Sequence, residues 1–396
     1  MSFKDSSKRI PPLGSLGSAF STQIAAGQPD SFVDPANIGI VSRETPSSTI
    51  ASKNGNTPVP QSGSSIAVAE AVGKAHSSPV LNGRSQGSKA NGEKSPAEVI
   101  DSLDDSTPLA RELASENKRR EKLAGRSLPR PEKTRVFTVS NQKGGVGKTT
   151  TTVNIAAALA GAGLNVLVVD IDPQGNASTA LGVEHHAEVT SIYDVLINDV
   201  SMSEVVSPSA DIPSLLCAPA TIHLAGAEIE LVSLVAREQR LRRALDVYAK
   251  DREKAGLERL DYVFVDCPPS LGLLTVNAFV AAGEVLIPIQ CEYYALEGLS
   301  QLLTNIEMIQ KHLNADLVVS TILLTMYDGR TNLAAQVASE VREHFPDQVL
   351  GAVVPRSVRI SEAPSYQQTV MTYDPSSSGA LSYLEAATEI AERKTP

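Results

Sequence analysis

A glycine-rich loop at residues 140–150, SNQKGGVGKTT, constrains the fold of this chain more than any other feature. It follows the apolar stretch VFTV and precedes a stretch rich in Ala and Leu that ends near Gly161. A strand, a glycine-rich turn and a helix in this order form a phosphate-binding unit, because the loop N–H groups and the helix N-terminus attract an anion. The loop therefore predicts a nucleotide-binding α/β domain.

This loop departs from the usual P-loop pattern, G-x-x-x-x-G-K-[ST]. The second half of the pattern is present as Gly147, Lys148 and Thr149, but Gln142 stands where the first glycine belongs. Lys143 adds a second lysine five residues before Lys148. We expect Lys148 to bind the outer phosphates and the Thr149 hydroxyl to bind Mg²⁺, which prefers oxygen ligands.

Apolar stretches alternate with helical stretches from Val136 onward. The apolar stretches are VFTVS, NVLVVDID, DYVFVDCP, EVLIPIQ, LVVSTILLT and LGAVVP. Strands that are buried on both faces have this composition, which predicts an α/β fold with a parallel sheet covered by helices on both faces. We place this P-loop NTPase domain at residues 135–396, with its ligand at the carboxyl ends of the strands.

Acidic residues follow two of the predicted strands. Asp266 ends DYVFVD, the position of the acid that holds Mg²⁺ in P-loop enzymes. Asp170 and Asp172 lie at the end of the second predicted strand. Asp172 is placed to orient the attacking water, but one of two neighbouring acids can also serve only to brace the loop. The sequence leaves the roles of Asp170 and Asp172 open.

The N-terminal part of the chain has a different composition. Residues 1–104 are rich in Ser, Gly, Ala and Pro with few aromatic residues, which predicts a disordered extension. Residues 105–134 predict one short helix, with Thr107 as its cap and Pro108 at its first position, and then a proline-containing linker. This helix is expected either to be solvated or to dock on a partner.

Charge, cysteines and hydropathy limit the function classes. The formal net charge is −10, and residues 135–396 carry 18 of the 35 basic and 31 of the 45 acidic side chains. An acidic domain argues weakly against nucleic-acid binding, although a local basic patch can override it. The three cysteines are isolated, which argues against a zinc or iron–sulfur site and favours a reducing cytoplasm. No stretch predicts a signal peptide or a membrane-spanning helix.

Several segments together resemble the ParA chromosome-partitioning ATPases of the deviant-Walker MinD/ParA superfamily. They occur in the expected order across residues 135–396: KGGVGKTTT, VDIDPQGNAS, APATIHLAGAEIELV, DYVFVDCPPSLGLLTVNA, CEYYALEGLSQL, YDGRTNLAAQV and VPRSVRISEAPS. The resemblance implies slow hydrolysis of ATP with Mg²⁺ by a cytoplasmic, nucleoid-associated protein. It also implies an ATP-dependent sandwich homodimer that binds DNA without sequence preference, and a ParB-type partner that stimulates hydrolysis. A polar scaffold protein is a further possible partner.

The resemblance also implies roles for individual residues. Lys143 would reach the phosphates of ATP bound to the partner chain, and Lys148 and Asp172 would complete the catalytic set. Thr149 would bind Mg²⁺ directly and Asp266 through water. The implied nucleotide-binding residues are Lys143, Gly144, Gly145, Val146, Gly147, Lys148, Thr149, Thr150, Asp172 and Pro355.

The implied DNA contacts are Arg356 and Arg359, three residues apart near the C-terminal region. Ordinary solvated arginines are the alternative for both, and Arg356 follows Pro355 closely enough to belong to the nucleotide site instead. Many relatives carry arginines after the YDP motif, where this chain has serines at 376–378. We therefore expect a modest DNA affinity, or a DNA affinity that needs help from elsewhere. The next candidates for DNA-contacting cations are Lys311, Arg330 and Arg393.

Three other functions compete with chromosome partitioning. A MinD-like membrane-associated positioning ATPase requires a basic amphipathic C-terminal helix, whereas the segment GALSYLEAATEIAERKTP predicts a docked helix that contains three acids. A metabolic or cluster-assembly ATPase would use cysteines or a substrate pocket, and no paired cysteines occur. A plasmid-type partition repressor would carry an N-terminal helix-turn-helix, which residues 1–100 do not predict.

Overall fold

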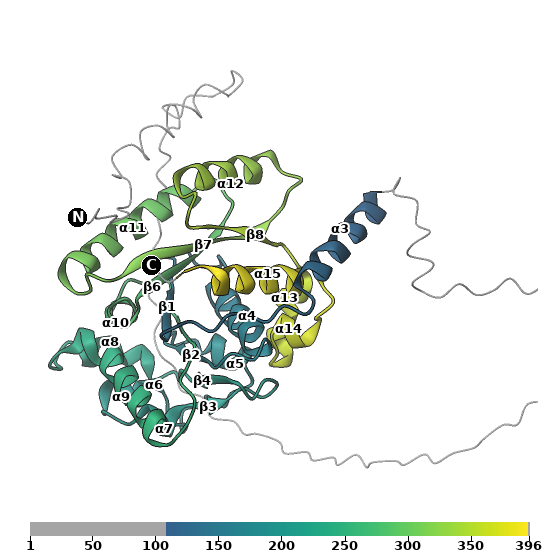
Figure 1. Ribbon diagram of the computed structural model, residues 1–396. Coiled ribbons are helices and arrows are strands. Elements are labelled where there is room, and N and C mark those ends of the chain that lie inside the picture. Colours follow the sequence, from purple (N-terminus) through teal and green to yellow (C-terminus); the bar gives the residue numbers. More distant parts are fainter. Residues whose placement is uncertain (1–107, 395–396) are drawn as a thin grey trace, which may run out of the picture. The chain divides into compact units, whose positions relative to one another are not determined.

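One twisted sheet organises the part of the chain that the structure, a computed structural model, describes, residues 108–394 (Figure 1). Its strands are β1 (Arg135–Val139), β2 (Val166–Asp170), β3 (Ser207–Pro208), β4 (Leu215–Ala218), β5 (Tyr262–Asp266), β6 (Glu284–Gln290), β7 (Val318–Tyr327) and β8 (Val349–Pro355). Their order is β3-β4-β2-β5-β1-β6-β7-β8. β3 is antiparallel to β4, and every other neighbouring pair is parallel. The predicted disordered extension, residues 1–104, lies outside the described residues.

Helices connect the strands. In chain order, the first are α3 (Pro108–Leu123), α4 (Lys148–Gly161), α5 (Asn176–Ala180), α6 (Ile192–Ile197), α7 (Met202–Val205), α8 (Leu224–Leu231), η2 (Arg237–Gln239), α9 (Arg240–Lys254) and α10 (Leu273–Ala281). The others are α11 (Ala295–His312), α12 (Asn332–His344), α13 (Val358–Glu362), η3 (Ala363–Tyr366), α14 (Val370–Tyr373) and α15 (Ser378–Glu392). Among the described helices, none is long and apolar enough to cross a membrane.

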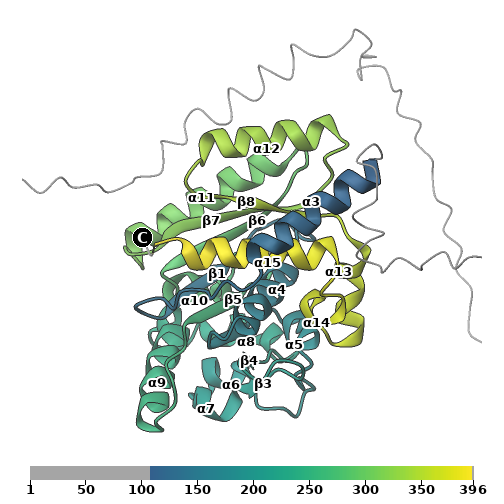
Figure 2. The ribbon, with the colours of Figure 1, turned by 45° about the vertical axis from the view of Figure 1, so that its right-hand side comes forward.

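Helices cover both faces of the sheet (Figures 1 and 2). On one face, Phe137 of β1 and Phe264 of β5 pack against the Ala-rich α4 and against α15. On the other face, β2 and β5 pack against α6 to α10, and β6 and β7 pack against α11 and α12. Because alternate strand residues point to opposite faces, strands with apolar side chains at every position serve both layers. The predicted α/β fold with helices on both faces is confirmed.

The strands confirm the six predicted stretches, with β6 matching EVLIPIQ residue for residue. The sequence reading missed β3 and β4. β4 is only four residues long, LLCA, and contains no β-branched or aromatic side chain that favours a strand over a helix. Its pairing with β2 is what makes it a strand.

A buried ion pair joins β1, β6 and the end of α15. The Arg135 guanidinium donates to both oxygens of Glu284 at 2.7 Å, and the two side chains are 3% and 4% exposed. Arg135 also donates to the Ile390 carbonyl at 2.7 Å and lies over the Phe137 ring, 4.9 Å from its centroid. Neighbouring strands and the last helix are thereby fixed relative to one another.

α3 lies against α15, held mainly by polar contacts. Arg119 pairs with Glu385 at 2.5 Å, and Arg126 pairs with Glu392 at 3.1 Å. Arg120 donates to the carbonyls of Pro375, Ser376 and Ser377, just before α15 begins. The helix predicted within residues 105–134 therefore docks on its own chain. The domain bounds given from the sequence stay predictions.

α15 also contacts the edge strand of the sheet. The Glu389 carboxylate accepts hydrogen bonds from the backbone N–H groups of Gly351 and Ala352 in β8, at 2.8 and 2.7 Å. Leu381, Ala387 and Ile390 of the same helix are buried. This agrees with the docked helix expected for the C-terminal segment.

Candidate nucleotide-binding site

The site residues come together because β2, β5 and β1 are neighbours in the sheet. Val139 at the end of β1 lies level with Asp266, and Asp266 lies level with Asp170. The glycine-rich loop leaves β1 at this edge and leads into α4. The carboxyl ends of three parallel strands thus converge on the loop, as predicted.

Left-handed backbone and side-chain contacts fix the loop. Gly145 and Gly147 have φ values of 74° and 86°, a conformation that favours glycine. Thr325 of β7 donates to the Val146 carbonyl at 2.8 Å. Asn141 donates to the Pro288 carbonyl at 2.9 Å and accepts from the Lys143 N–H at 3.0 Å. These hydrogen bonds and the two left-handed glycines fix the shape of the loop within the chain.

Gly144 is a different case from the two left-handed glycines. A Cβ atom on Gly144 would meet no atom of this chain within 4 Å. Packing inside the chain therefore gives no reason for glycine here.

The two lysines of the loop lie in opposite environments. Lys148 is the first residue of α4 and is 8% exposed, with its Nζ 3.4 Å from the Lys143 carbonyl. Burial lowers the pKa of Lys148, while the Asp266 carboxylate acts in the opposite direction. The Lys143 side chain is 38% exposed and pairs with Glu292 at 2.5 Å. Sequence reasoning missed Glu292, although it lies in the quoted CEYYALEGLSQL segment.

A hydroxyl and a carboxylate form a pair suited to Mg²⁺. Thr149 donates to one oxygen of Asp266 at 2.7 Å, and Thr152 donates to the other at 2.9 Å. Burial and, next, the Asp170 carboxylate raise the pKa of Asp266 to about 8. A bound cation would relieve this cost of burying charge. Among residues 108–394, no three or more His, Cys, Asp or Glu are grouped so that they could hold a metal ion. The Thr149 hydroxyl and the Asp266 carboxylate suit Mg²⁺, and phosphate and water oxygens would complete its coordination.

Asp170 and Asp172 differ in what they contact. Asp170 is wholly buried and accepts from the Ser178 N–H at 2.9 Å, the Ser178 hydroxyl at 2.7 Å and the Asp172 N–H at 3.2 Å. Burial raises the pKa of Asp170 to about 6, against the effect of these hydrogen bonds. Asp172 is 8% exposed and accepts from the Gln174 N–H at 3.0 Å. The geometry gives Asp170 the bracing contacts and leaves Asp172 with fewer.

A second group of predicted residues lies at the end of β8. Pro355 pairs with Tyr327 at the end of β7, and the Arg356 N–H donates to the Tyr327 carbonyl at 3.4 Å. The Arg356 side chain is exposed. Arg359 is also exposed, but it lies 3.4 Å from each of two carboxylates, Glu362 and Asp374. Arg359 is therefore partly neutralised within its own chain, which the spacing of the two arginines did not reveal.

The other predicted residues are also placed by the structure. Thr150 lines a cavity of about 240 Å³ beside the start of α4, together with Asn176 of α5 and Pro364 of η3. Of the reserve cations, Arg393 donates to the carbonyls of Ser320, Gln348 and Val349 and so has a structural role. Arg330 forms a two-pronged pair with Asp328, and Lys311 is exposed at the end of α11.

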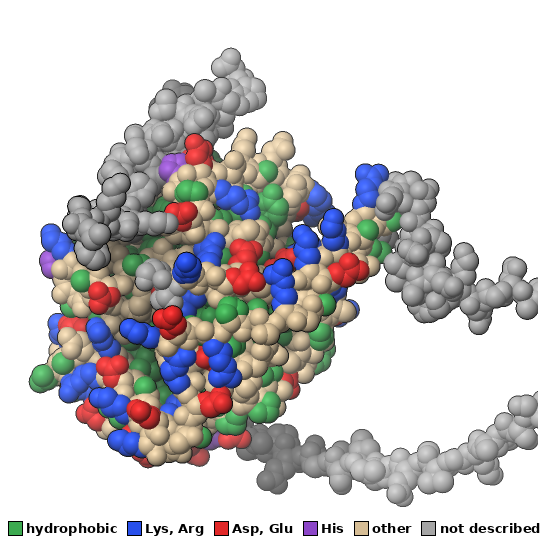
Figure 3. Space-filling model, viewed as in Figure 1, with side chains coloured by type: hydrophobic (Ala, Val, Ile, Leu, Met, Phe, Trp, Pro, Cys, Tyr) green, Lys and Arg blue, Asp and Glu red, His purple; other side chains and the backbone are tan. Residues whose placement is uncertain are grey.

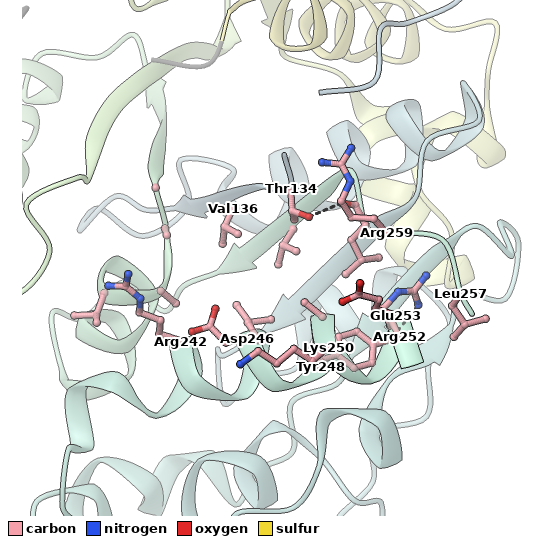
Figure 4. Close-up of a pocket in the computed structure, with 18 of the residues that line it drawn as sticks. Thr134, Val136, Arg242, Asp246, Tyr248, Lys250, Arg252, Glu253, Leu257 and Arg259 are labelled. Carbon is pink, nitrogen blue, oxygen red and sulfur yellow. Dashed lines mark hydrogen bonds between the residues drawn. The ribbon is translucent and has the colours of Figure 1, made fainter. Parts of the chain in front are cut away.

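A cavity of about 940 Å³ lies away from this site (Figure 4). It opens between α9 and the amino ends of β1, β5 and β6, where Thr134, Leu260 and Gly283 line it. None of its lining residues belongs to the glycine-rich loop. Since ligands of such sheets bind at the carboxyl ends of the strands, this cavity is not the nucleotide site.

Comparisons with known proteins bear on the whole domain. A family model described as an AAA domain matches residues 134–319. The chain is 52% identical over 257 residues to the sporulation initiation inhibitor protein Soj of Bacillus subtilis, covering 65% of this chain and 98% of Soj. It is 50% identical over 262 residues to the chromosome partitioning protein ParA of Myxococcus xanthus, covering 66% of this chain and 89% of ParA.

Solved structures share the fold. A cobyrinic acid a,c-diamide synthase from Mycobacterium smegmatis, with bound ADP and magnesium, is 37% identical with a TM-score of 0.56, covering 66% of this chain and 98% of that one. The cell division ATPase MinD of Pyrococcus furiosus is 25% identical with a TM-score of 0.52, covering 65% and 98%. The identities to Soj and ParA are higher than those to the solved structures, and they extend over nearly the whole of Soj. The chain therefore belongs to the Soj/ParA family of chromosome-partitioning ATPases.

Proposed function

We propose that this chain is a DNA-associated partitioning ATPase whose ATP-bound form is a homodimer and whose hydrolysis is accelerated by a ParB-type partner. The observation that carries the proposal is the separation of the two loop lysines. Lys148 is buried behind the loop, whereas Lys143 lies on its exposed side. One lysine serves the nucleotide of its own chain and the other is available to a second chain.

The site geometry supports the following chemistry within one chain. The N–H groups of Gly144, Gly145, Val146, Gly147 and Thr150 bind phosphate oxygens together with Lys148, and Pro355 contacts the nucleotide. Thr149 and Asp266 hold Mg²⁺, which supplies charge neutralisation at the phosphates when bound. Asp172 orients the attacking water. Hydrolysis by the chain alone is slow in this proposal, and the ParB-type partner accelerates it.

Dimerisation depends on nucleotide for an electrostatic reason. Two loops that face each other bring two Lys143 side chains together, and these repel unless phosphate lies between them. Bound ATP supplies that negative charge, so each phosphate group is neutralised by two chains. In the free chain the Lys143–Glu292 pair holds the lysine at the exposed side of the loop. Dimer formation exchanges that partner for phosphate.

DNA binding is proposed to use the exposed arginines at the end of β8. Arg356 and Arg359 contact backbone phosphates without reading sequence, and a dimer presents both patches at once. Binding of this kind associates the ATP-bound form with the nucleoid. A membrane-associated function has less support, because α15 buries its apolar face in the domain and does not offer it to lipid.

The test is ATP hydrolysis by the full chain alone, with double-stranded DNA, and with DNA and the cognate ParB-type protein. We expect a low basal rate and a several-fold increase only when DNA and partner are both present. The Lys148→Ala variant sets the background. A rate that responds to neither addition would contradict the proposal, as would ATP-dependent binding to anionic vesicles without binding to DNA.

A further inference from the structure

We propose that Thr325, near the end of β7, is a positioning residue for the nucleotide: it holds the Val146–Gly147 peptide so that the Gly147 N–H points toward a bound phosphate. This inference rests on the proposed phosphate binding by the loop N–H groups. Thr325 lies 179 positions after Val146 and outside the family model, which ends at residue 319. The sequence placed it only in an apolar stretch, LVVSTILLT.

The glycine-rich loop crosses the carboxyl ends of two strands to reach Thr325. β6 lies between β1 and β7, and Asn141 at the start of the loop donates to the Pro288 carbonyl of β6 at 2.9 Å. Further along the loop, the Val146 carbonyl accepts from the Thr325 hydroxyl of β7 at 2.8 Å. Val146 is 1% exposed and Thr325 is 2% exposed. Water therefore does not compete with Thr325 for this carbonyl.

The direction of the Val146 carbonyl decides where the next N–H group points. In a planar trans peptide the C=O and N–H bonds point in opposite directions. Because the Val146 carbonyl points toward β7, the Gly147 N–H points away from β7. Among residues 108–394, this N–H donates a hydrogen bond to no other group. It is therefore available to an anion, in a loop whose left-handed glycines present successive N–H groups.

Without the bond from Thr325, this peptide could turn over at low cost. Gly147 has a φ of 86°, and a residue without a Cβ atom adopts either sign of φ readily. Rotation of the Val146–Gly147 peptide would turn the N–H away from the phosphate and point the carbonyl oxygen toward it. Carbonyl and phosphate oxygens repel each other, because both carry negative charge. Thr325 opposes this rotation from outside the loop.

A β-bulge at the end of β7 is a second observation that this strand end supports the loop. Between Leu324 and Tyr327, β7 has one residue more than the matching part of β8. Within the bulge, Met326 has a φ of 48°, which is uncommon for a residue with a side chain. Neighbouring side chains of a regular strand point to opposite faces. Here Thr325 bonds the loop, and the Met326 methyl carbon would lie 3.8 Å from a Cβ atom on Gly147. Bulges re-aim side chains in this way next to functional sites.

The competing explanation is that Thr325 only satisfies a buried carbonyl. Loss of its hydroxyl would then lower stability without a specific effect on nucleotide binding. Thr321, four residues earlier in β7, is the matched control, because it is 1% exposed and its hydroxyl lies 3.3 Å from that of Ser320. No hydrogen bond among the described residues joins Thr321 to the loop. Both threonines are buried, so neither substitution changes the mixed basic and acidic surface that Figure 3 shows.

The experiment measures ADP affinity with Mg²⁺, the KM and kcat of ATP hydrolysis, and the thermal unfolding midpoint, all on the full chain. Thr325→Val keeps the shape of the side chain and removes the hydroxyl. It should weaken ADP binding and raise KM by about 10-fold with kcat nearly unchanged, because the Gly147 N–H contacts phosphate before and during the reaction alike. Thr325→Ser keeps a hydroxyl and should bind ADP as the parent does.

Thr321→Val should leave ADP affinity within about two-fold, whatever its effect on the unfolding midpoint. Thr325→Ala should lose affinity as Thr325→Val does, and it replaces the valine variant if that variant does not fold. Unchanged affinity without the Thr325 hydroxyl, or an equal loss in Thr321→Val, overturns the inference and leaves the proposed function standing. Undiminished ADP binding by Lys148→Ala would instead overturn the proposed phosphate site.

Discussion

Two lysines within six residues, Lys143 and Lys148, are proposed to serve two different purposes. Removing the exposed Lys143 should not disturb the chain's own phosphate site, because we propose that this site is built from loop N–H groups and Lys148, which is buried. We therefore expect Lys143→Ala to bind nucleotide with near-normal affinity and to form no ATP-dependent dimer. Sedimentation with a slowly hydrolysed analogue measures the dimer, and nucleotide titration measures the affinity.

Two further variants serve as controls for that measurement. Lys148→Ala should lose nucleotide binding and, with it, the dimer. Glu292→Ala frees Lys143 from its ion pair and should keep the dimer. A normal dimer in Lys143→Ala would contradict the proposal that this lysine contacts the nucleotide of the partner chain.

Asp172 and Asp170 should respond differently to substitution. Asp172→Ala removes the proposed water-orienting carboxylate, so hydrolysis should slow by about 100-fold or more while ATP binding survives. Asp170→Asn replaces a carboxylate that accepts three hydrogen bonds, so it should lower thermal stability instead. Turnover assays and thermal unfolding separate the two. Normal turnover in the Asp172→Ala variant would show that another group orients the attacking water.

The buried Asp266 makes stability depend on pH. Its pKa in the folded state is raised to about 8, so between its ordinary value of about 4 and pH 8 the folded chain holds a proton that the unfolded chain has lost. Stability of the nucleotide-free protein should therefore fall as pH rises through this window. Asp266→Asn should flatten the dependence. Thermal unfolding from pH 5 to 8.5 tests this; a curve that rises throughout in the parent would contradict it.

At the scale of the elements, β1 is joined to β6 and to the end of α15 through the buried side chain of Arg135. Arg135→Ala leaves the buried Glu284 charge unpaired and should cost about 3–5 kcal/mol of stability. Removing both charges together, as Arg135→Met/Glu284→Leu, should be much less costly. The exposed pair Arg126–Glu392, whose side chains are 51% and 52% exposed, provides the control. Arg126→Ala should lower the free energy of unfolding in denaturant titrations much less than Arg135→Ala does.

Elements with a strong local pattern could be predicted, whereas contacts between distant residues could not. The apolar strands and the loop-helix unit are visible because burial on both faces and the phosphate-binding turn each impose a composition. β4 is a strand only through its pairing with β2. The pairing of Glu292 with Lys143, and the neutralisation of Arg359 by Glu362 and Asp374, depend on tertiary placement. The bracing contacts of Asp170 involve Ser178, eight residues away, and their geometry is visible only in the folded chain.

At the scale of the whole molecule, the proposed DNA binding is by a domain with many more acids than bases. Arg356 is exposed, whereas Arg359 already faces two carboxylates. We expect Arg356→Glu to weaken DNA binding more than Arg359→Glu, and the double variant to abolish it while the dimer persists. DNA titrations at several salt concentrations measure this. If Arg356→Glu weakens ATP binding instead, Arg356 belongs to the nucleotide site.

The hydrogen bonds from β8 to Glu389 have a consequence for how copies of this protein coexist. β8 is the outermost strand on its side of the sheet, and such a strand is a ready template for a strand of another molecule. Glu389 occupies the backbone N–H groups of Gly351 and Ala352 in this strand and places a negative charge beside them. Copies of this chain, for which we propose reversible pairing through the nucleotide face, are thereby hindered from joining irreversibly, sheet to sheet, into aggregates.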